Sequence, residues 1–158
     1  MNGTAWLFLF CLFVGWLVAR RGSRTSAVVG HSHGDERATI AVHEAGHVVA
    51  ARAVGGTVTS ARMNDHGGRV KWAMPDPNSL VVEVTQNVAF LRAGEYAAGD
   101  DGGCGGDRSS VKQQLRRLPS GQRSVVRRAG EQRARQIVSS QSGGIARVAE
   151  RLNRRGRL

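Results

Sequence analysis

Residues 35–54, with the sequence DERATIAVHEAGHVVAARAV, form the stretch that decides the fold of this chain. Asp35 can serve as the N-cap of a helix, and Gly55-Gly56 supplies a stop signal at the other end. Between these two signals, apolar residues recur at helical spacing: Ile40, Ala41, Ala45, Val48 and Val49. The segment therefore predicts one amphipathic helix.

Two histidines of this helix, His43 and His47, are four residues apart and therefore point the same way. Two imidazoles on one face can bind one Zn²⁺, and Glu44 lies where it can act as general base on a water at the metal. This H-E-x-x-H arrangement is typical of zinc metalloproteases. The alternative is a pair of ordinary histidines on a half-buried helix. Gly46 fits either close packing of another backbone or room beside the metal.

The five residues His43-Glu44-Ala45-Gly46-His47 resemble the motif of a known family, the proteolytic domain of FtsH-type membrane-anchored zinc metalloproteases. Residues 67–75, GGRVKWAMP, look like the strand that follows the motif helix, and residues 88–98 are similar to the next helix. The resemblance implies a mainly α, zincin-like protease domain with a small β-sheet over residues 35–158. It also implies a metalloendopeptidase that uses Zn²⁺ and cleaves polypeptide substrates.

A catalytic zinc site needs three protein ligands and an open position, and the motif supplies only two of them. The resemblance assigns the third ligand to Asp107, which follows a glycine-rich loop and precedes a helical run over residues 108–118. From the residues alone, Asp107 is also an ordinary helix N-cap. His66, the only histidine downstream of the motif, lies in a turn-like stretch. The other acidic candidates are Glu95, Asp100 and Asp101.

The first 19 residues carry no charged side chain, and residues 5–19 are almost wholly apolar, with Trp6 and Trp16 near the ends. We expect residues 1–21 to form a transmembrane anchor and residues 22–34 a linker. A cleaved signal peptide is the alternative, but it would carry positive charge before the apolar run. Arginines follow the run instead, so the positive-inside rule predicts a single-pass membrane protein with a cytoplasmic catalytic domain.

The rest of the chain predicts short strands over residues 58–63 and 69–74, separated by a turn at Gly67-Gly68. A helix over residues 79–98 follows, Pro119 ends the next helix, and Gly143-Gly144 separates the last two. The strand over residues 69–74 can pair with an extended substrate by strand addition, as its counterpart does in the family. The two cysteines, Cys11 and Cys104, imply no disulfide framework.

The formal net charge is +11, and its excess comes from arginines in the C-terminal half. Basic helices bind nucleic acid or anionic lipid, or simply form a solvated face. No aromatic residue follows Tyr96, so no base-stacking platform is visible and nucleic acid is not the expected partner. A non-catalytic, membrane-tethered binding module that retains a vestigial metal site is therefore the alternative to a peptidase.

The chain departs from the family by having no ATPase domain. Full-length relatives carry one between the anchor and the protease, whereas here the P-loop pattern is absent, since neither Lys71 nor Lys112 follows a glycine. This chain thus has no visible means of using ATP to unfold substrates. A separate AAA+ ATPase partner and a homo-oligomer are left open by the resemblance.

Overall fold

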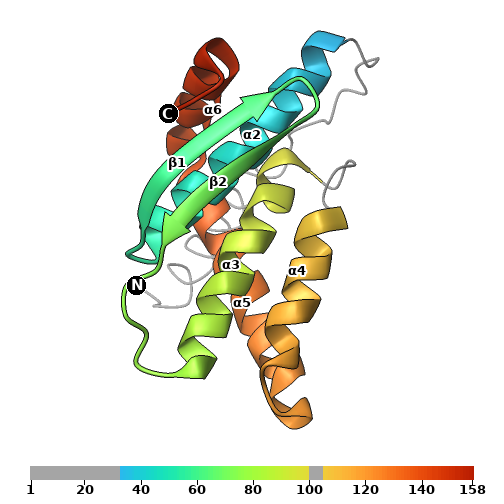
Figure 1. The fold of residues 1–158 in the computed structure, drawn as a ribbon, viewed down its shortest axis with the longest axis vertical. Helices are drawn as coiled ribbons and strands as arrows, with labels where there is room; N and C mark the ends of the chain where they lie inside the picture. Colours follow the sequence, from blue (N-terminus) through green and yellow to red (C-terminus); the bar gives the residue numbers. More distant parts are fainter. Residues whose placement is uncertain (1–32, 100–104) are drawn as a thin grey trace, which may run out of the picture. The chain divides into compact units, whose positions relative to one another are not determined.

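The structure, a computed structural model, describes residues 33–99 and 105–158. Its elements follow the order α2 (His33–Ala53), β1 (Thr57–Asn64), β2 (Gly67–Ala73), α3 (Leu80–Ala98), α4 (Gly105–Arg116), α5 (Ser120–Ser140) and α6 (Ser142–Arg155) (Figure 1). The two strands form one antiparallel sheet. The prediction of a mainly helical domain with a small β-sheet is therefore confirmed.

The motif helix α2 runs slightly further than predicted at its N-terminus. It begins at His33, so Asp35 lies inside the helix, and the last two residues of the expected linker 22–34 are helical. The backbone N–H groups of the first turn have no partner within the helix, so a glycine there costs little. Gly34 therefore does not stop the helix. The start of α3 agrees with the prediction, because the Ser79 hydroxyl accepts a hydrogen bond of 3.3 Å from the backbone N–H of Val82.

The hairpin turn lies at Asp65 and His66. The prediction that placed the turn at Gly67-Gly68 was therefore wrong. The side chain of Asn64 accepts a hydrogen bond of 2.9 Å from the backbone N–H of His66, and this local bond closes the turn. Gly67 and Gly68 instead begin β2, where Gly67 pairs with Asn64 and Gly68 with Met63.

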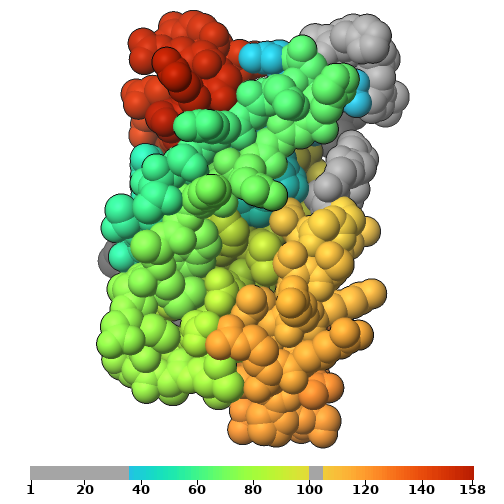
Figure 2. Space-filling model, viewed as in Figure 1, coloured from blue at the N-terminus to red at the C-terminus, as the bar shows by residue number. Residues whose placement is uncertain are grey.

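The hairpin lies over α2, and in the space-filling view it hides most of that helix (Figure 2). Ala61 and Met63 of β1 are buried against the helices, whereas the intervening Arg62 is exposed, as the period of a strand requires. After α6 the chain pairs with the outer side of β1 through two backbone hydrogen bonds, from Met63 to Gly156 (2.8 Å) and from Leu158 to Ala61 (3.0 Å). The main core contains Ala41, Ala45, Val48, Met63, Ile137, Ile145 and Leu152.

A second hydrophobic cluster fastens α4 to α3 and α5. Val111 and Leu115 of α4 are buried in it, one turn apart on the same helix face. Burying a valine or leucine side chain stabilises by roughly 1.5–3 kcal/mol, so the pair holds α4 firmly against its neighbours. The other buried members are Val84, Val88, Leu118 and Val126.

The boundary between α5 and α6 lies at Gln141, and Gly143-Gly144 lie inside the first turn of α6, so the predicted break at the glycines was wrong. Gln141 ends α5 by donating its N–H to the carbonyl of Ile137 and begins α6 by accepting from the N–H of Ile145, both at 2.9 Å. One residue thus satisfies both helix ends without a left-handed glycine.

Residues Ser32–Leu158 form a single compact unit with its own hydrophobic cores, which is the property of a domain that folds independently. Among the described residues, no helix combines the length and the apolar character needed to cross a bilayer. The expected anchor over residues 1–21 and both cysteines lie outside the described residues.

The contact between α3 and α5 depends on Gly130. A Cβ atom at this position would lie 2.6 Å from Cβ of Val88 and 3.0 Å from the carbonyl oxygen of Thr85. We predict that Gly130→Ala destabilises the fold by about 1–2 kcal/mol, because overpacking outweighs the gain of roughly 1 kcal/mol in helix propensity. Urea unfolding followed by circular dichroism measures the change.

Gly121, in the first turn of the same helix, is the matched control. A Cβ there meets nothing within 4 Å, so Gly121→Ala leaves the free energy of unfolding unchanged or slightly raised. Equal stability of the two variants would show that α5 moves freely away from α3.

Candidate metal centre

Three side chains from two helices converge at one point. Nε2 of His43 lies 3.0 Å from Nε2 of His47, and both histidines project from the same face of α2. Oδ2 of Asp107, in the first turn of α4, lies 3.0 Å from Nε2 of His43 and 3.1 Å from Nε2 of His47. The structure thus brings together all three residues for which metal binding is predicted, although 60 residues separate His47 from Asp107.

The position of Asp107 follows from the packing of α4. Asp107, Val111 and Leu115 are spaced by four residues, so they share one face of the helix. That face is buried against α3 and α5 through Val111 and Leu115, and it points its first residue toward the histidines. Asp107 lies inside the first turn, where the helix dipole also favours a carboxylate.

The donor set fits a divalent cation. In tetrahedral coordination with bonds of ~2.0–2.1 Å, neighbouring ligand atoms lie about 3.3–3.4 Å apart, within a few tenths of an ångström of the distances observed here. Two imidazole nitrogens and one carboxylate oxygen suit Zn²⁺, and the same set also occurs in non-haem Fe(II) sites. Three acceptor atoms facing one another repel unless a cation or protons lie between them.

The imidazole of His47 is held in one orientation from behind. Its Nδ1–H donates to the backbone carbonyl of Phe90 at 2.8 Å, which leaves the lone pair of the neutral ring on Nε2, facing the other two groups. The ring of Phe90 packs against the imidazole with centroids 4.8 Å apart, and Trp72 of β2 stacks on Phe90 at 4.9 Å. The aromatic pair thus forms the inner wall of the site.

The electrostatics of the three groups are coupled. Burial alone would raise the pKa of Asp107, but hydrogen bonds with His43 and His47 outweigh it and place this pKa well below its ordinary value. Burial alone would lower the pKa of His47, yet the hydrogen bond and charge of Asp107 raise it. A metal ion bound here would displace any proton on the ligating atoms, because metal ligands must be deprotonated.

Glu44 lies next to this group, and its carboxylate is buried without a full set of hydrogen-bond partners among the described residues. Its side chain is buried, with 5% of the residue exposed, and Oε2 has no hydrogen-bond partner among the described residues. Burial raises its pKa, and attraction to His47 and His43 only partly offsets this. Gly68 of β2 packs directly on the carboxylate: a Cβ there would lie 2.7 Å from Oε1 of Glu44. A buried acceptor without a protein donor is suited to a hydrogen bond from water at the site.

Two glycines allow α2 and α3 to approach each other at the site. A Cβ atom at Gly94 of α3 would lie 2.6 Å from Nε2 of His47 and 2.9 Å from Cε1 of His43, so this glycine makes room for both imidazoles. Gly46, by contrast, packs against the backbone of α3, where a Cβ would lie 2.6 Å from the carbonyl oxygen of Ala93. Of the two explanations for Gly46, the structure therefore supports close backbone packing.

Glu95, considered as a third ligand, does not belong to the metal-binding group. It is buried, with 1% exposed, and forms ion pairs with Arg92 and, at 2.8 Å, with Nη2 of Arg108. Because Arg108 follows Asp107 directly, this ion pair with a buried carboxylate helps to hold the first turn of α4 over the site. His66 is exposed in the hairpin turn and is also not part of the group. Asp100 and Asp101 lie outside the described residues.

Sequence reasoning missed Phe90 and Gly94. Both lie on α3, four residues apart and therefore on the face that meets the histidines. A glycine within an otherwise apolar helix signals a close approach, and that signal was present at Gly94. The role of the Phe90 carbonyl carries no signal, because it depends on how α3 packs against α2.

No model of a known protein family matches this chain, and no curated protein matches it either. The resemblance to FtsH-type metalloproteases accordingly stays an interpretation of the motif and of Asp107. The geometry of the metal-binding group is an independent observation.

We predict that the purified full-length chain binds about one divalent ion and that Asp107→Ala loses it, because two histidines alone leave the ion underligated. Elemental analysis by mass spectrometry measures the stoichiometry and distinguishes zinc from iron. Asp65→Ala, which removes an exposed carboxylate paired with Arg37, is the matched control and keeps the ion. Full metal content in Asp107→Ala would remove Asp107 from the ligand set.

A methyl group at Gly94 tests the space beside the histidines. Gly94→Ala is expected to lower metal affinity about 10–100-fold, the range found for residues that orient ligands, because both imidazoles must move. Competition with a chromophoric chelator measures the affinity. Gly106→Ala, where a Cβ meets nothing within 4 Å, should bind metal normally. Unchanged affinity in Gly94→Ala would mean that the imidazoles relax without loss.

Proposed function

We propose that this chain is a metalloendopeptidase that uses Zn²⁺ to hydrolyse peptide bonds in polypeptides. The observation that supports this most directly is a buried carboxylate, Glu44, directly beside a three-ligand group that solvent can reach. The side chains of His43 and Asp107 are 16% and 21% exposed to solvent, whereas the side chain of His47 is 6% exposed. A substrate can thus approach from the side of His43 and Asp107.

The side chains divide the chemistry among them. When bound, a zinc ion acidifies a water and polarises a carbonyl group. Glu44 acts as general base, taking the proton of the attacking water and passing it to the leaving amine. Oε2 of Glu44, which has no hydrogen-bond partner in the part of the chain that the structure describes, is the acceptor available for that proton. His47 is kept in the ligating tautomer by Phe90, and Asp107 contributes the negative charge of the ligand set.

Substrate binding is proposed at the open edge of β2. Gly67–Ala73 is paired with β1 on one side only, among the described residues, and β2 contributes Gly68 beside Glu44. An extended chain added there would be read through its backbone, so we propose broad specificity for peptides and loosely folded chains. Some parts of the proposal rest on the sequence alone. They are a separate AAA+ ATPase partner, a homo-oligomer, a membrane anchor over residues 1–21 and a cytoplasmic catalytic domain.

The second candidate function is a non-catalytic binding module that is tethered to the membrane and keeps the metal for stability. The excess of exposed arginines favours a binding role of some kind. The two candidates differ in one observable, which is peptide cleavage by the metal-loaded protein.

We predict that Glu44→Gln lowers the rate of peptide cleavage by about 10²–10⁴-fold, because the general base is lost, while the bound metal is unchanged. Cleavage of an unfolded protein labelled with a quenched fluorophore measures the rate, using the full-length chain in detergent. The matched control is Glu36→Gln, which changes an exposed glutamate at the start of the same helix and should cleave normally.

Two results would change the assignment. A Glu44→Gln variant that cleaves at the normal rate would remove Glu44 from the mechanism. A wild-type protein that carries its metal and cleaves none of a varied set of unfolded substrates would favour the binding module instead.

A further inference from the structure

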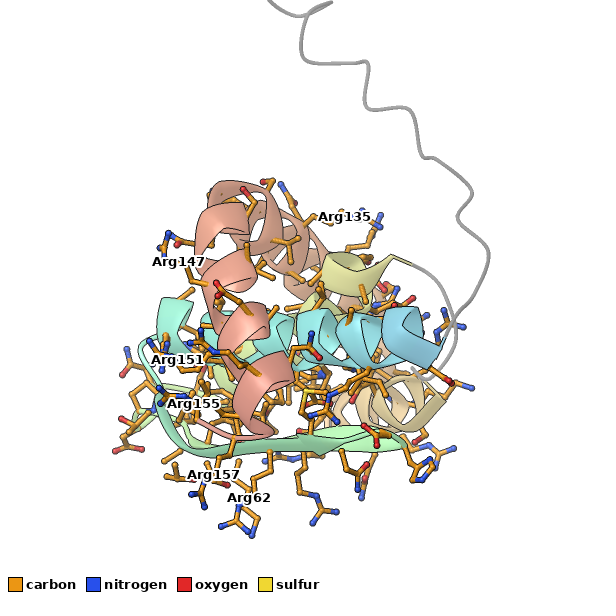
Figure 3. The ribbon with its side chains drawn as sticks, turned by 90° about the horizontal axis from the view of Figure 1, so that it is seen from above. Arg62, Arg135, Arg147, Arg151, Arg155 and Arg157 are labelled. Carbon is orange, nitrogen blue, oxygen red and sulfur yellow. The ribbon has the colours of Figure 1, made fainter. Side chains whose placement is uncertain are left out.

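A row of arginines crosses the solvent face of the sheet. Arg62 of β1 lies opposite Arg69 in the register with β2, and opposite Arg157 in the bridge made by the segment after α6. Residues directly opposite in antiparallel strands place their side chains on the same face, about 5 Å apart. All three are exposed, and Figure 3 shows Arg62 and Arg157 side by side below the sheet.

Helix α6 continues this row. Arg147, Arg151 and Arg155 are spaced by four residues, so they share one exposed face of the helix. Figure 3 shows them following α6 toward Arg157 and Arg62. We call the six residues together the arginine band: Arg62, Arg69, Arg147, Arg151, Arg155 and Arg157.

Within residues 33–99 and 105–158, no acidic side chain lies within ion-pair distance of the arginine band. None of its side chains makes a hydrogen bond or ion pair with another described residue. Some other arginines of the domain are paired, for example Arg37 with Asp65 and Arg117 with Glu83. Like charges directly opposite in a sheet, or four apart on a helix, destabilise the fold. A binding partner that carries many negative charges would relieve this repulsion.

Phosphate groups are the anions that match this surface. A guanidinium binds phosphate through two parallel hydrogen bonds, and it stays charged at every physiological pH. The described aromatic rings already have stacking partners, since Trp72 stacks on Phe90 and the guanidinium groups of Arg92 and Arg135 each lie over the ring of Tyr96. The sequence also contains the apolar run over residues 5–19. These observations favour a membrane surface over nucleic acid.

We propose that the arginine band binds the anionic headgroups of a lipid bilayer. The contact holds the hairpin and α6 against the membrane surface and does not depend on peptidase activity. Each basic residue close to an anionic surface contributes about a fivefold gain in partitioning, and salt weakens the effect. Three residues of the band together should thus account for at least about a tenfold preference for anionic over neutral bilayers.

Residues 32–158, which form one compact unit, allow the test to be made without the apolar run. Co-sedimentation compares vesicles of phosphatidylcholine alone with vesicles that also contain phosphatidylglycerol. The test variant replaces Arg62, Arg69 and Arg157 with glutamine, and a second one replaces Arg147, Arg151 and Arg155. The matched control removes the same number of charges from exposed arginines outside the band, on α2, α4 and α5: Arg52, Arg116 and Arg128.

We expect wild type and the control variant to bind the anionic vesicles more tightly than the neutral ones. In both band variants, the ratio of binding to anionic over neutral vesicles should fall at least about tenfold. Circular dichroism checks that each variant is folded, and the second band variant decides the result should the first unfold. The proposal is overturned by equal losses in the control, which would indicate a net-charge effect, or by no loss in either band variant. Tighter binding of wild type to duplex DNA than to anionic vesicles at the same salt would also overturn it.

Discussion

Nε2 of His43, Nε2 of His47 and Oδ2 of Asp107 lie 3.0–3.1 Å from one another, and the rest of the structure depends on this convergence. Such an arrangement is unfavourable for neutral imidazoles and a carboxylate without a cation or protons between them. The packing of three helices must therefore enforce it. Helix α2 contributes the spacing of the histidines, α3 the space at Gly94, and α4 a carboxylate held by its own buried side chains.

The parts of the fold that depend on local signals were predictable. The helical period of α2, the strand alternation around Ala61 and the Ser79 cap of α3 each act within one segment of chain. The hairpin turn was misplaced because the Asn64 side chain, rather than a glycine, closes it. The break before α6 was misplaced because Gln141 satisfies both helix ends.

The candidate site was only partly predictable for a related reason. The motif identified His43, Glu44 and His47 through spacing alone, whereas Asp107 required a resemblance, because a glycine-rich loop does not fix the direction in which the next helix leaves. The Phe90 carbonyl and the room at Gly94 arise from the approach of α3 to α2, and periodicity contains no information on such contacts. Charge is used in two opposite ways here: beside the site the buried carboxylate of Glu95 is paired with Arg92 and Arg108, whereas the side chains of the arginine band have no ion-pair partner among the described residues.

The segment that follows α6 has a consequence for how the molecule meets other copies of itself. Its backbone hydrogen bonds to Ala61 and Met63 occupy the outer side of β1, so that side offers no row of unpaired amides to a neighbouring hairpin. Unprotected strand edges are a common route to aggregation. In the described part of the chain only the edge of β2 stays open, so pairing of sheets between two copies would join β2 to β2 and end at a dimer.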